Sequence, residues 1–295
     1  MTEIGLDDKS STPTSVGFHT NSRVGDTLEE TLSRIKAAGF DCIQLDTKQD
    51  LETGILLAYR IGLKVEYVHL PYRQLNKRNT NDLWAFGAAN KALIKSTIDL
   101  IKICDKHNVP VAILHQSHET GKYPNEIHCT KQGIKSLRKI LSATKECKTK
   151  IAIENLNVSD NKYLEILLDA IDDPRFGFCY DSGHHYLYIP KVDIIGKYGD
   201  RVFAVHLQDN LMDATNLETT DRDIHLLPFD GKIDFKKVMQ DIAQSSYNGP
   251  IMIESKYERK EVGLFHYKSI PPIDFLKEAY KRGERLAKML EALKK

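Results

Sequence analysis

Short apolar runs and longer amphipathic stretches alternate along this chain. The short runs are rich in Val, Ile and Phe and are almost continuously apolar, which is typical of strands buried on both faces. They predict strands at residues 16–20, 41–46, 64–69, 109–115, 150–155, 175–181, 201–207 and 250–254. Apolar residues three and four positions apart predict helices at 27–39, 90–108, 130–147, 161–171, 234–244 and 273–295, and weaker patterns predict helices at 51–61 and 191–198.

This alternation predicts an α/β fold with a parallel sheet, and it favours a closed (β/α)8 TIM barrel over an open doubly wound sheet. No GxGxxG phrase follows the first predicted strand, which counts against a dinucleotide-binding fold. No linker interrupts the pattern, so we expect a single barrel domain over residues 15–295. Residues 1–14 are polar and are expected to form a disordered or loosely attached tail.

The composition is that of a globular protein with a sizeable core, with 41% hydrophobic and 28% charged residues among 295. The net charge of +1 gives no global attraction to nucleic acid or to a membrane, although a local basic patch could still bind nucleic acid. We expect no signal peptide, because residues 1–15 contain no apolar segment, and no apolar run in the sequence is long enough to span a membrane. The five cysteines are widely spaced, which favours reduced thiols and a cytoplasmic location. The sequence leaves open whether the chain assembles into a homo-oligomer.

Side chains that bind metal ions lie at the ends of most predicted strands, where barrel enzymes build their active sites. The most informative are Glu154, Asp181, His206 and Glu254, which end four consecutive strands. Buried carboxylates in such proximity repel one another unless a cation lies between them. A divalent cation, Zn²⁺ or Mn²⁺ above all, would satisfy them. A salt-bridge network with lysine or arginine is the alternative.

Further candidates surround these four. His69 and His115 could complete a second metal position with Glu154, and the phrase around Asp223 and His225, with His184, could build a third. We therefore expect one ion and allow up to three. His19, Asp46 and Lys256 could orient a ligand or contact the substrate, and Trp84 could cover a substrate or simply pack its loop onto the rim.

The phrases GFDCIQLD, VHLPY, IAIENL, YDSGHH, VHLQDN, DRDIHLLPFDGKIDF and IMIES, in this order, resemble the xylose isomerase-like TIM-barrel superfamily over about residues 16–290. That superfamily holds sugar and sugar phosphate isomerases, ketose 3-epimerases, inosose-processing enzymes and the endonuclease IV family. By this resemblance, Glu154, Asp181, His206 and Glu254 match the single metal site of the sugar enzymes. The other five residues match the extra ligands of a three-zinc cluster in the endonuclease IV branch: His69, His115, His184, Asp223 and His225. Phe229 stands where the epimerase-type phrase usually has glycine.

The resemblance implies a metal-dependent isomerase or epimerase of a small sugar, sugar phosphate or cyclitol. Glu154 and Glu254 would serve as acid and base on either side of an enediolate. Two alternatives remain open at this point. One is a zinc phosphodiesterase that cleaves DNA at abasic sites, and the other is a metal-binding relative without catalytic activity.

Overall fold

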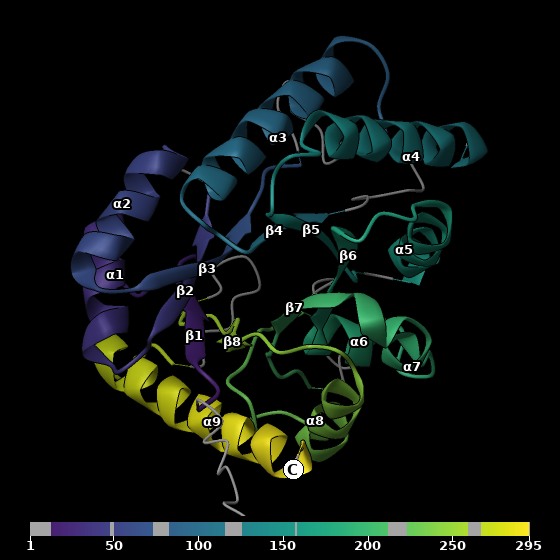
Figure 1. Ribbon diagram of the computed structural model, residues 1–295. Coiled ribbons are helices and arrows are strands. Elements are labelled where there is room, and N and C mark those ends of the chain that lie inside the picture. The colour runs from purple at the N-terminus through teal and green to yellow at the C-terminus, as the bar shows by residue number, and fades with distance from the viewer. Residues whose placement is uncertain are drawn as a thin grey trace, which may run out of the picture.

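A computed structural model describes residues 13–47, 50–72, 83–115, 126–156, 158–211, 223–258 and 267–294. Eight parallel strands form one sheet in the order β7-β6-β5-β4-β3-β2-β1-β8 (Figure 1). The strands are β1 (Val16–His19), β2 (Cys42–Asp46), β3 (Lys64–His69), β4 (Val111–His115), β5 (Lys150–Glu154), β6 (Phe176–Asp181), β7 (Val202–His206) and β8 (Ile251–Ile253). Each predicted strand is therefore confirmed, with shifts at the ends only.

The two edge strands of this sheet meet. Leu207, just after β7, forms a parallel bridge with Ile253 of β8. The amide of Leu207 donates to the Met252 carbonyl at 2.9 Å, and the amide of Glu254 donates to the Leu207 carbonyl at 3.1 Å. These bonds bring the sheet close to a full circle, so the single-domain TIM barrel expected from the sequence is confirmed.

Helices surround the strands on the outside, as Figure 1 shows. They are α1 (Leu28–Ala37), α2 (Leu51–Ile61), α3 (Ala88–Lys106), α4 (Glu126–Ala143), α5 (Val158–Ala170), α6 (Ser182–Tyr188), α7 (Ile194–Tyr198), α8 (Phe235–Gln244) and α9 (Pro272–Leu293), with a 3-10 turn, η2 (Gly199–Arg201). The sequence pattern misses α6, because its seven residues carry no apolar repeat. The predicted helix at 130–147 starts earlier, at Glu126, and ends at Ala143.

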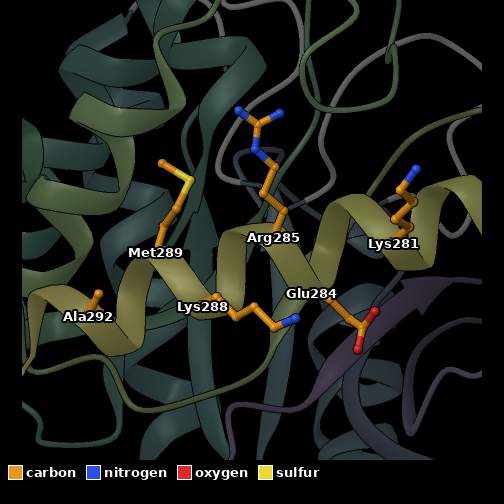
Figure 2. A pocket seen from close by; sticks show the side chains of 6 residues that line it. All are labelled: Lys281, Glu284, Arg285, Lys288, Met289 and Ala292. Atoms are coloured by element: carbon orange, nitrogen blue, oxygen red, sulfur yellow. The ribbon is translucent and has the colours of Figure 1, made fainter.

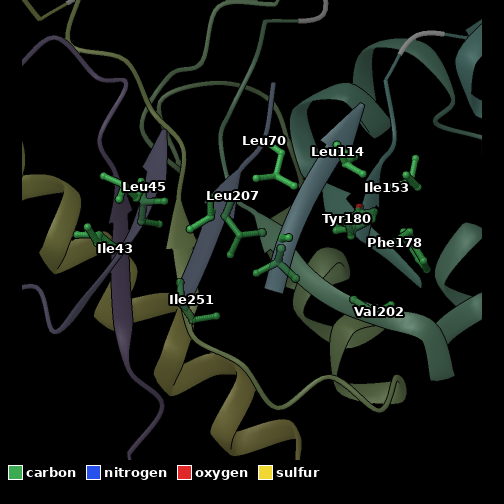
Figure 3. Packing of buried hydrophobic residues seen from close by; sticks show 14 of the residues in the cluster. Ile43, Leu45, Leu70, Leu114, Ile153, Phe178, Tyr180, Val202, Leu207 and Ile251 are labelled. Carbon is green, nitrogen blue, oxygen red and sulfur yellow. The ribbon is translucent and has the colours of Figure 1, made fainter. Parts of the chain in front are cut away.

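Apolar side chains fill two regions. The larger lies between strands and helices, where residues such as Ile43, Phe178 and Ile251 pack (Figure 3). The smaller lies inside the barrel and consists of Cys42, Tyr67, Val111, Ile113, Ala152, Cys179, Ala204 and Met252. Because side chains alternate along a strand, the residue two positions further on points into the same interior. For β3 to β8 this position holds, in order, His69, His115, Glu154, Asp181, His206 and Glu254, and for β2 it holds Gln44, so a polar layer rests on an apolar floor.

The first described residues pack against the last helix. The amide of Thr14 donates to the Glu291 carboxylate of α9 at 2.7 Å. Residues 1–12 of the expected tail lie outside the described residues. Across the described ranges, we find no helix with the length and apolar character that crossing a lipid bilayer requires.

Candidate metal centre

Four side chains from strands β5 to β8 converge at the barrel mouth: Glu154, Asp181, His206 and Glu254. One ligand atom from each lies within 4.8 Å of those of the other three. His206 Nδ1 is 3.1 Å from Glu254 Oε2, 3.4 Å from Glu154 Oε1 and 3.8 Å from Asp181 Oδ2. All four residues are buried, and Asp181 and His206 are fully enclosed. We call these four residues the central group.

The charges of the central group are not balanced by lysine or arginine. Within the described part of the chain, the three carboxylates form ion pairs with histidines only, so the lysine or arginine network considered above is not found there. Burial, reinforced by the charges of Glu154 and Glu254, raises the pKa of Asp181 to about 8. A proton thus competes for the space that a dication would fill.

The central group fits a divalent cation by its unsatisfied atoms. Glu154 Oε2, His206 Nδ1 and Glu254 Oε2 are buried, and none of them forms a hydrogen bond with any described residue. Buried polar atoms are rarely left in this state, and a bound ion is one of the few explanations. Three carboxylates and one imidazole are a donor set that suits Mn²⁺ or Zn²⁺.

A second group shares Glu154 with the first. The Nε2 atoms of His69 and His115 lie 3.0 Å apart, and they are 3.4 and 3.3 Å from Glu154 Oε2. The two oxygens of Glu154 therefore face different groups, Oε1 toward His206 and Oε2 toward the histidine pair. His69 Nδ1 donates to the Leu70 carbonyl at 3.2 Å, which leaves the lone pair of Nε2 for the pocket.

A third group gathers around Asp223. Its Oδ2 atom is 2.7 Å from His225 Nε2 and 3.3 Å from His184 Nε2. The other ring nitrogens donate to backbone carbonyls, His184 Nδ1 to Asn155 at 3.0 Å and His225 Nδ1 to Glu254 at 2.8 Å. With Nδ1 as the donor, each neutral ring has its lone pair on Nε2, so a cation between these atoms and Asp223 Oδ2 would gain two imidazole ligands and one carboxylate ligand.

The turn after His225 is fixed by Asp209. Its carboxylate accepts from the amides of Asn210, Phe229, Gly231 and Ile233 at 2.8–3.0 Å. Phe229, where the family phrase has glycine, adopts a left-handed backbone with φ 74°, a conformation that favours glycine. The bond from its amide to Asp209, at 3.0 Å, holds that conformation.

Two glutamines that sequence reasoning missed belong to the site. Gln44 Oε1 accepts a hydrogen bond from His206 Nε2 at 2.5 Å. Gln208 Nε2 lies 3.2 Å from both oxygens of Asp181 and 3.2 Å from Asp223 Oδ1, so it links the central and third groups. The available signal was position: Gln44 occupies an inward position of an otherwise apolar strand, and Gln208 follows directly after another.

Four further residues predicted for the site do not belong to any of the three groups: His19, Asp46, Lys256 and Trp84. His19 is buried, donates from Nε2 to the Ser255 carbonyl at 2.8 Å, and has its pKa lowered to about 3 by burial. Asp46 ends β2 and is half-buried, and the amide of Lys256 donates to the His225 carbonyl at 2.9 Å. Trp84 is buried and packs on Tyr163 with ring centroids 5.3 Å apart, which matches packing of its loop.

A separate groove of about 530 Å³ lies on α9 (Figure 2). It is lined by Lys281, Glu284, Arg285, Lys288, Met289 and Ala292. None of these residues belongs to the three groups, and their charged ends are typical of a solvated helix face. The convergent chemistry of the described residues lies at the barrel mouth instead.

Comparisons with known proteins agree with this architecture. Over 181 residues, the chain is 29% identical to the uncharacterized protein y4fM of Sinorhizobium fredii. This match covers 59% of this chain but only 50% of that protein. It is 23% identical to the inosose dehydratase of Clostridium tetani, over 82% of this chain and 86% of that enzyme. The structure of D-psicose 3-epimerase from Clostridium cellulolyticum superposes with a TM-score of 0.67 at 13% identity, covering 95% of this chain and 99% of the epimerase.

The structural likeness at this identity establishes the fold alone. The sequence profile of the family described as Xylose isomerase-like TIM barrel matches residues 32–286, which is most of the chain. The order of the strand-end motifs and the eight-stranded barrel agree with that match. This chain therefore belongs to the xylose isomerase-like TIM-barrel family.

Proposed function

We propose that this protein is a metal-dependent isomerase or epimerase of a small sugar, sugar phosphate or cyclitol. The observation that carries the proposal is the central group, in which Glu154 and Glu254 approach His206 Nδ1 from different strands without a lysine or arginine partner among the described residues. Glu154, Asp181, His206 and Glu254 would hold the cation. A divalent cation supplies Lewis acidity, which makes a C–H bond beside a carbonyl more acidic.

The two glutamates would move the proton. Each has an oxygen that is buried and forms no hydrogen bond with the described residues, Oε2 in both cases. A carboxylate in this state can remove a proton from a substrate carbon and return it to the same or the opposite face. Burial at the floor of the mouth excludes water, which protects an enediolate from protonation at the wrong position.

The relatives support this reaction class. The named enzymes that resemble this chain include an inosose dehydratase and a D-psicose 3-epimerase whose structure was determined with D-tagatose. Removal of a proton next to a carbonyl is a step that both reactions can share. The histidines that flank Glu154 would then contact substrate hydroxyls, and the Nε2 lone pair of His69 would accept a hydrogen bond from one of them.

Exchange of substrate hydrogen for deuterium tests the class without knowledge of the product. The protein, loaded with Mn²⁺, would be incubated in D₂O with ketoses, ketose phosphates and inososes, and proton NMR would follow the C–H signals next to the carbonyl. We expect exchange with at least one of them. We expect the Glu254→Gln variant to lose this exchange by about 10²–10⁴-fold, because the amide cannot accept the proton.

Glu165→Gln is the matched control, since Glu165 pairs with Lys197 on the surface, far in the fold from the mouth. This variant should exchange substrate hydrogen at the wild-type rate. Full activity of Glu254→Gln would remove Glu254 from the proposed role. Absence of exchange across the whole panel would count against the isomerase and epimerase class.

A second candidate function rests on the two additional groups. His69, His115 and Glu154 form one set of three ligand atoms within 4.8 Å, and His184, Asp223 and His225 form another. Three neighbouring metal positions, two of which share Glu154, suit hydrolysis of a phosphodiester better than proton transfer at carbon. The net charge of +1 offers little general attraction to DNA.

Metal content separates the two candidates. The protein would be purified without added metal, and mass spectrometry would give the ions per chain. About one ion favours the sugar enzyme, and about three, together with cleavage of an abasic-site duplex at substoichiometric enzyme, favours the phosphodiesterase. Three ions without cleavage would leave the hydrolase unsupported.

A further inference from the structure

Gln44 crosses the barrel interior to reach a residue of the central group. It lies in β2 and is buried, and its Oε1 atom is 2.5 Å from His206 Nε2 at the end of β7. Strands β1 and β8 separate β2 from β7 in the sheet. This hydrogen bond therefore joins distant parts of the chain at the centre of the candidate site.

The bond determines which nitrogen of His206 carries a proton. An amide oxygen can only accept, so Nε2 of His206 must be the donor. In the neutral ring, Nδ1 then has a lone pair directed at Glu254 Oε2 and Glu154 Oε1, 3.1 and 3.4 Å away. A lone pair opposite two carboxylates is repulsive unless a metal ion or a proton lies between them. The same geometry is what an imidazole ligand requires.

His206 differs from the other histidines in how its ring is held. His69, His184 and His225 each donate a ring nitrogen to a backbone carbonyl. Substitution cannot easily remove a backbone acceptor. For His206 the acceptor is a side chain, so the effect of the tautomer on metal binding can be tested at this position.

We propose that Gln44 is a positioning residue, which holds His206 in the Nε2–H tautomer and so presents Nδ1 to the cation of the central group. This inference rests on the metal binding in the proposed function. Gln44 would itself contact neither cation nor substrate. Its strand is well fixed for the task, because the Gln44 carbonyl accepts from the Thr20 amide at 3.0 Å and the residue is in register with His19 on β1.

Two substitutions test the role. Gln44→Met keeps the length of the side chain but removes the acceptor, whereas Gln44→Glu keeps an acceptor oxygen. We expect Gln44→Met to weaken binding of Mn²⁺, measured by titration calorimetry, by about 10–100-fold. We expect Gln44→Glu to stay within a few-fold of the wild type. A side chain that only filled space would give the opposite order, since methionine is the better apolar filler.

The tautomer itself provides a readout that needs no activity. Long-range ¹⁵N–¹H NMR of the metal-free protein, recorded at an alkaline pH at which the His206 ring is neutral, reports which ring nitrogen is protonated. The His206 signals are assigned by their loss in His206→Asn. We expect Nε2–H in the wild type and in Gln44→Glu, and a shift toward Nδ1–H in Gln44→Met. Gln132→Met is the matched control, because Gln132 donates to Asn90 between α3 and α4 and should alter neither readout.

The outcomes distinguish this inference from the proposed function. If the wild type binds Mn²⁺ and Gln44→Met binds it equally well, the role of Gln44 is overturned and the proposed function stands. If the wild type binds no divalent cation, the proposed function fails, and with it the effect of Gln44 on affinity. Should Gln44→Met not fold, the wild type and Gln44→Glu decide the test. An Nδ1–H ring in the wild type would overturn the proposal. An Nε2–H ring in the wild type, with a chemical shift that changes in Gln44→Glu, would support it.

Discussion

Single side chains at the barrel mouth are held by hydrogen bonds that leave little freedom. Gln208 contacts Asp181 and Asp223 through Nε2 while its Oε1 accepts from Asn210 at 3.1 Å. Asn210 Oδ1 accepts from the Ile224 amide at 2.6 Å, which fixes the segment that carries Asp223 and His225. This amide pair therefore ties the third group to the central group, and displacement of either amide would disturb both.

Gly183 leaves the space that this amide pair occupies. A Cβ atom on Gly183 would lie 2.4 Å from Gln208 Cδ and 2.6 Å from Asn210 Nδ2. We expect Gly183→Ala to lower the free energy of unfolding by about 1–3 kcal/mol, because buried amides with fixed partners cannot move away easily. Urea unfolding followed by circular dichroism measures the change.

Gly199→Ala serves as the comparison for that variant. Its Cβ would meet Ser245 Cβ at 3.3 Å, a contact that a small shift relieves, and its backbone is helical with φ −60°. We expect a change below about 1 kcal/mol. Equal stability of Gly183→Ala and the wild type would show that the amides have room to rearrange.

Strands and helices differ in how far the sequence predicts them. The strands were predictable, because each is a short apolar run and its last inward position carries the polar residue that the next layer needs. Helix α6 was not, because Ser182–Tyr188 holds a glycine and two histidines in place of an apolar repeat. It begins instead at a cap, where Asp181 Oδ1 accepts from the His184 amide at 2.7 Å. One carboxylate thus serves both the helix start and the central group.

Helix α8 offers a test of capping away from the site. Asp234 at its N-cap accepts from the amides of Lys236 and Lys237 at 3.0 and 3.2 Å. We expect Asp234→Ala to reduce the free energy of unfolding by about 1 kcal/mol, since these amides would lose their acceptor. Chemical denaturation measures the loss, and metal binding should be unaffected.

Asp99→Ala is the comparison for the capping variant, because it removes a carboxylate from an exposed pair with Lys95 in the middle of α3. Such pairs contribute between zero and about 0.5 kcal/mol. A loss in Asp99→Ala as large as in Asp234→Ala would mean that charge, and not capping, accounts for the effect.

Closure of the barrel decides which of the polar residues meet. Glu154 and Glu254 are a hundred residues apart in the chain. Strand β8 pairs with β1 on one side, and the bonds to Leu207 after β7 on its other side close the barrel and bring Glu254 near the ends of β5 to β7. Sequence reasoning anticipated the three groups because strand ends of a parallel barrel share one face. It did not anticipate Gln44 or Gln208, since an inward amide within a strand or just after one is assigned to the site only by the atom that it contacts.

The folded molecule as a whole should depend on the cation. Glu154, Asp181 and Glu254 bury three carboxylates together, and their repulsion opposes folding unless a dication or protons offset it. A cation that binds only the folded chain stabilises it by about 2.7 kcal/mol at a hundred times its dissociation constant. In a large domain, each kcal/mol of stabilisation raises the Tm by roughly 2–4 °C. We therefore expect Mn²⁺ to raise the Tm of chelator-treated protein by about 5–10 °C.

Asp181→Asn separates specific binding from a general effect of salt. Asparagine keeps an oxygen that can accept from the His184 amide, so helix α6 retains its cap, but the central group loses a charged ligand. We expect the Tm of this variant to respond weakly to Mn²⁺, and both proteins to respond equally weakly to Mg²⁺, which suits a site with a nitrogen ligand poorly. Scanning calorimetry of the chelator-treated proteins with each ion gives the four values. A Tm rise in Asp181→Asn as large as in the wild type would place the stabilising ion outside the central group.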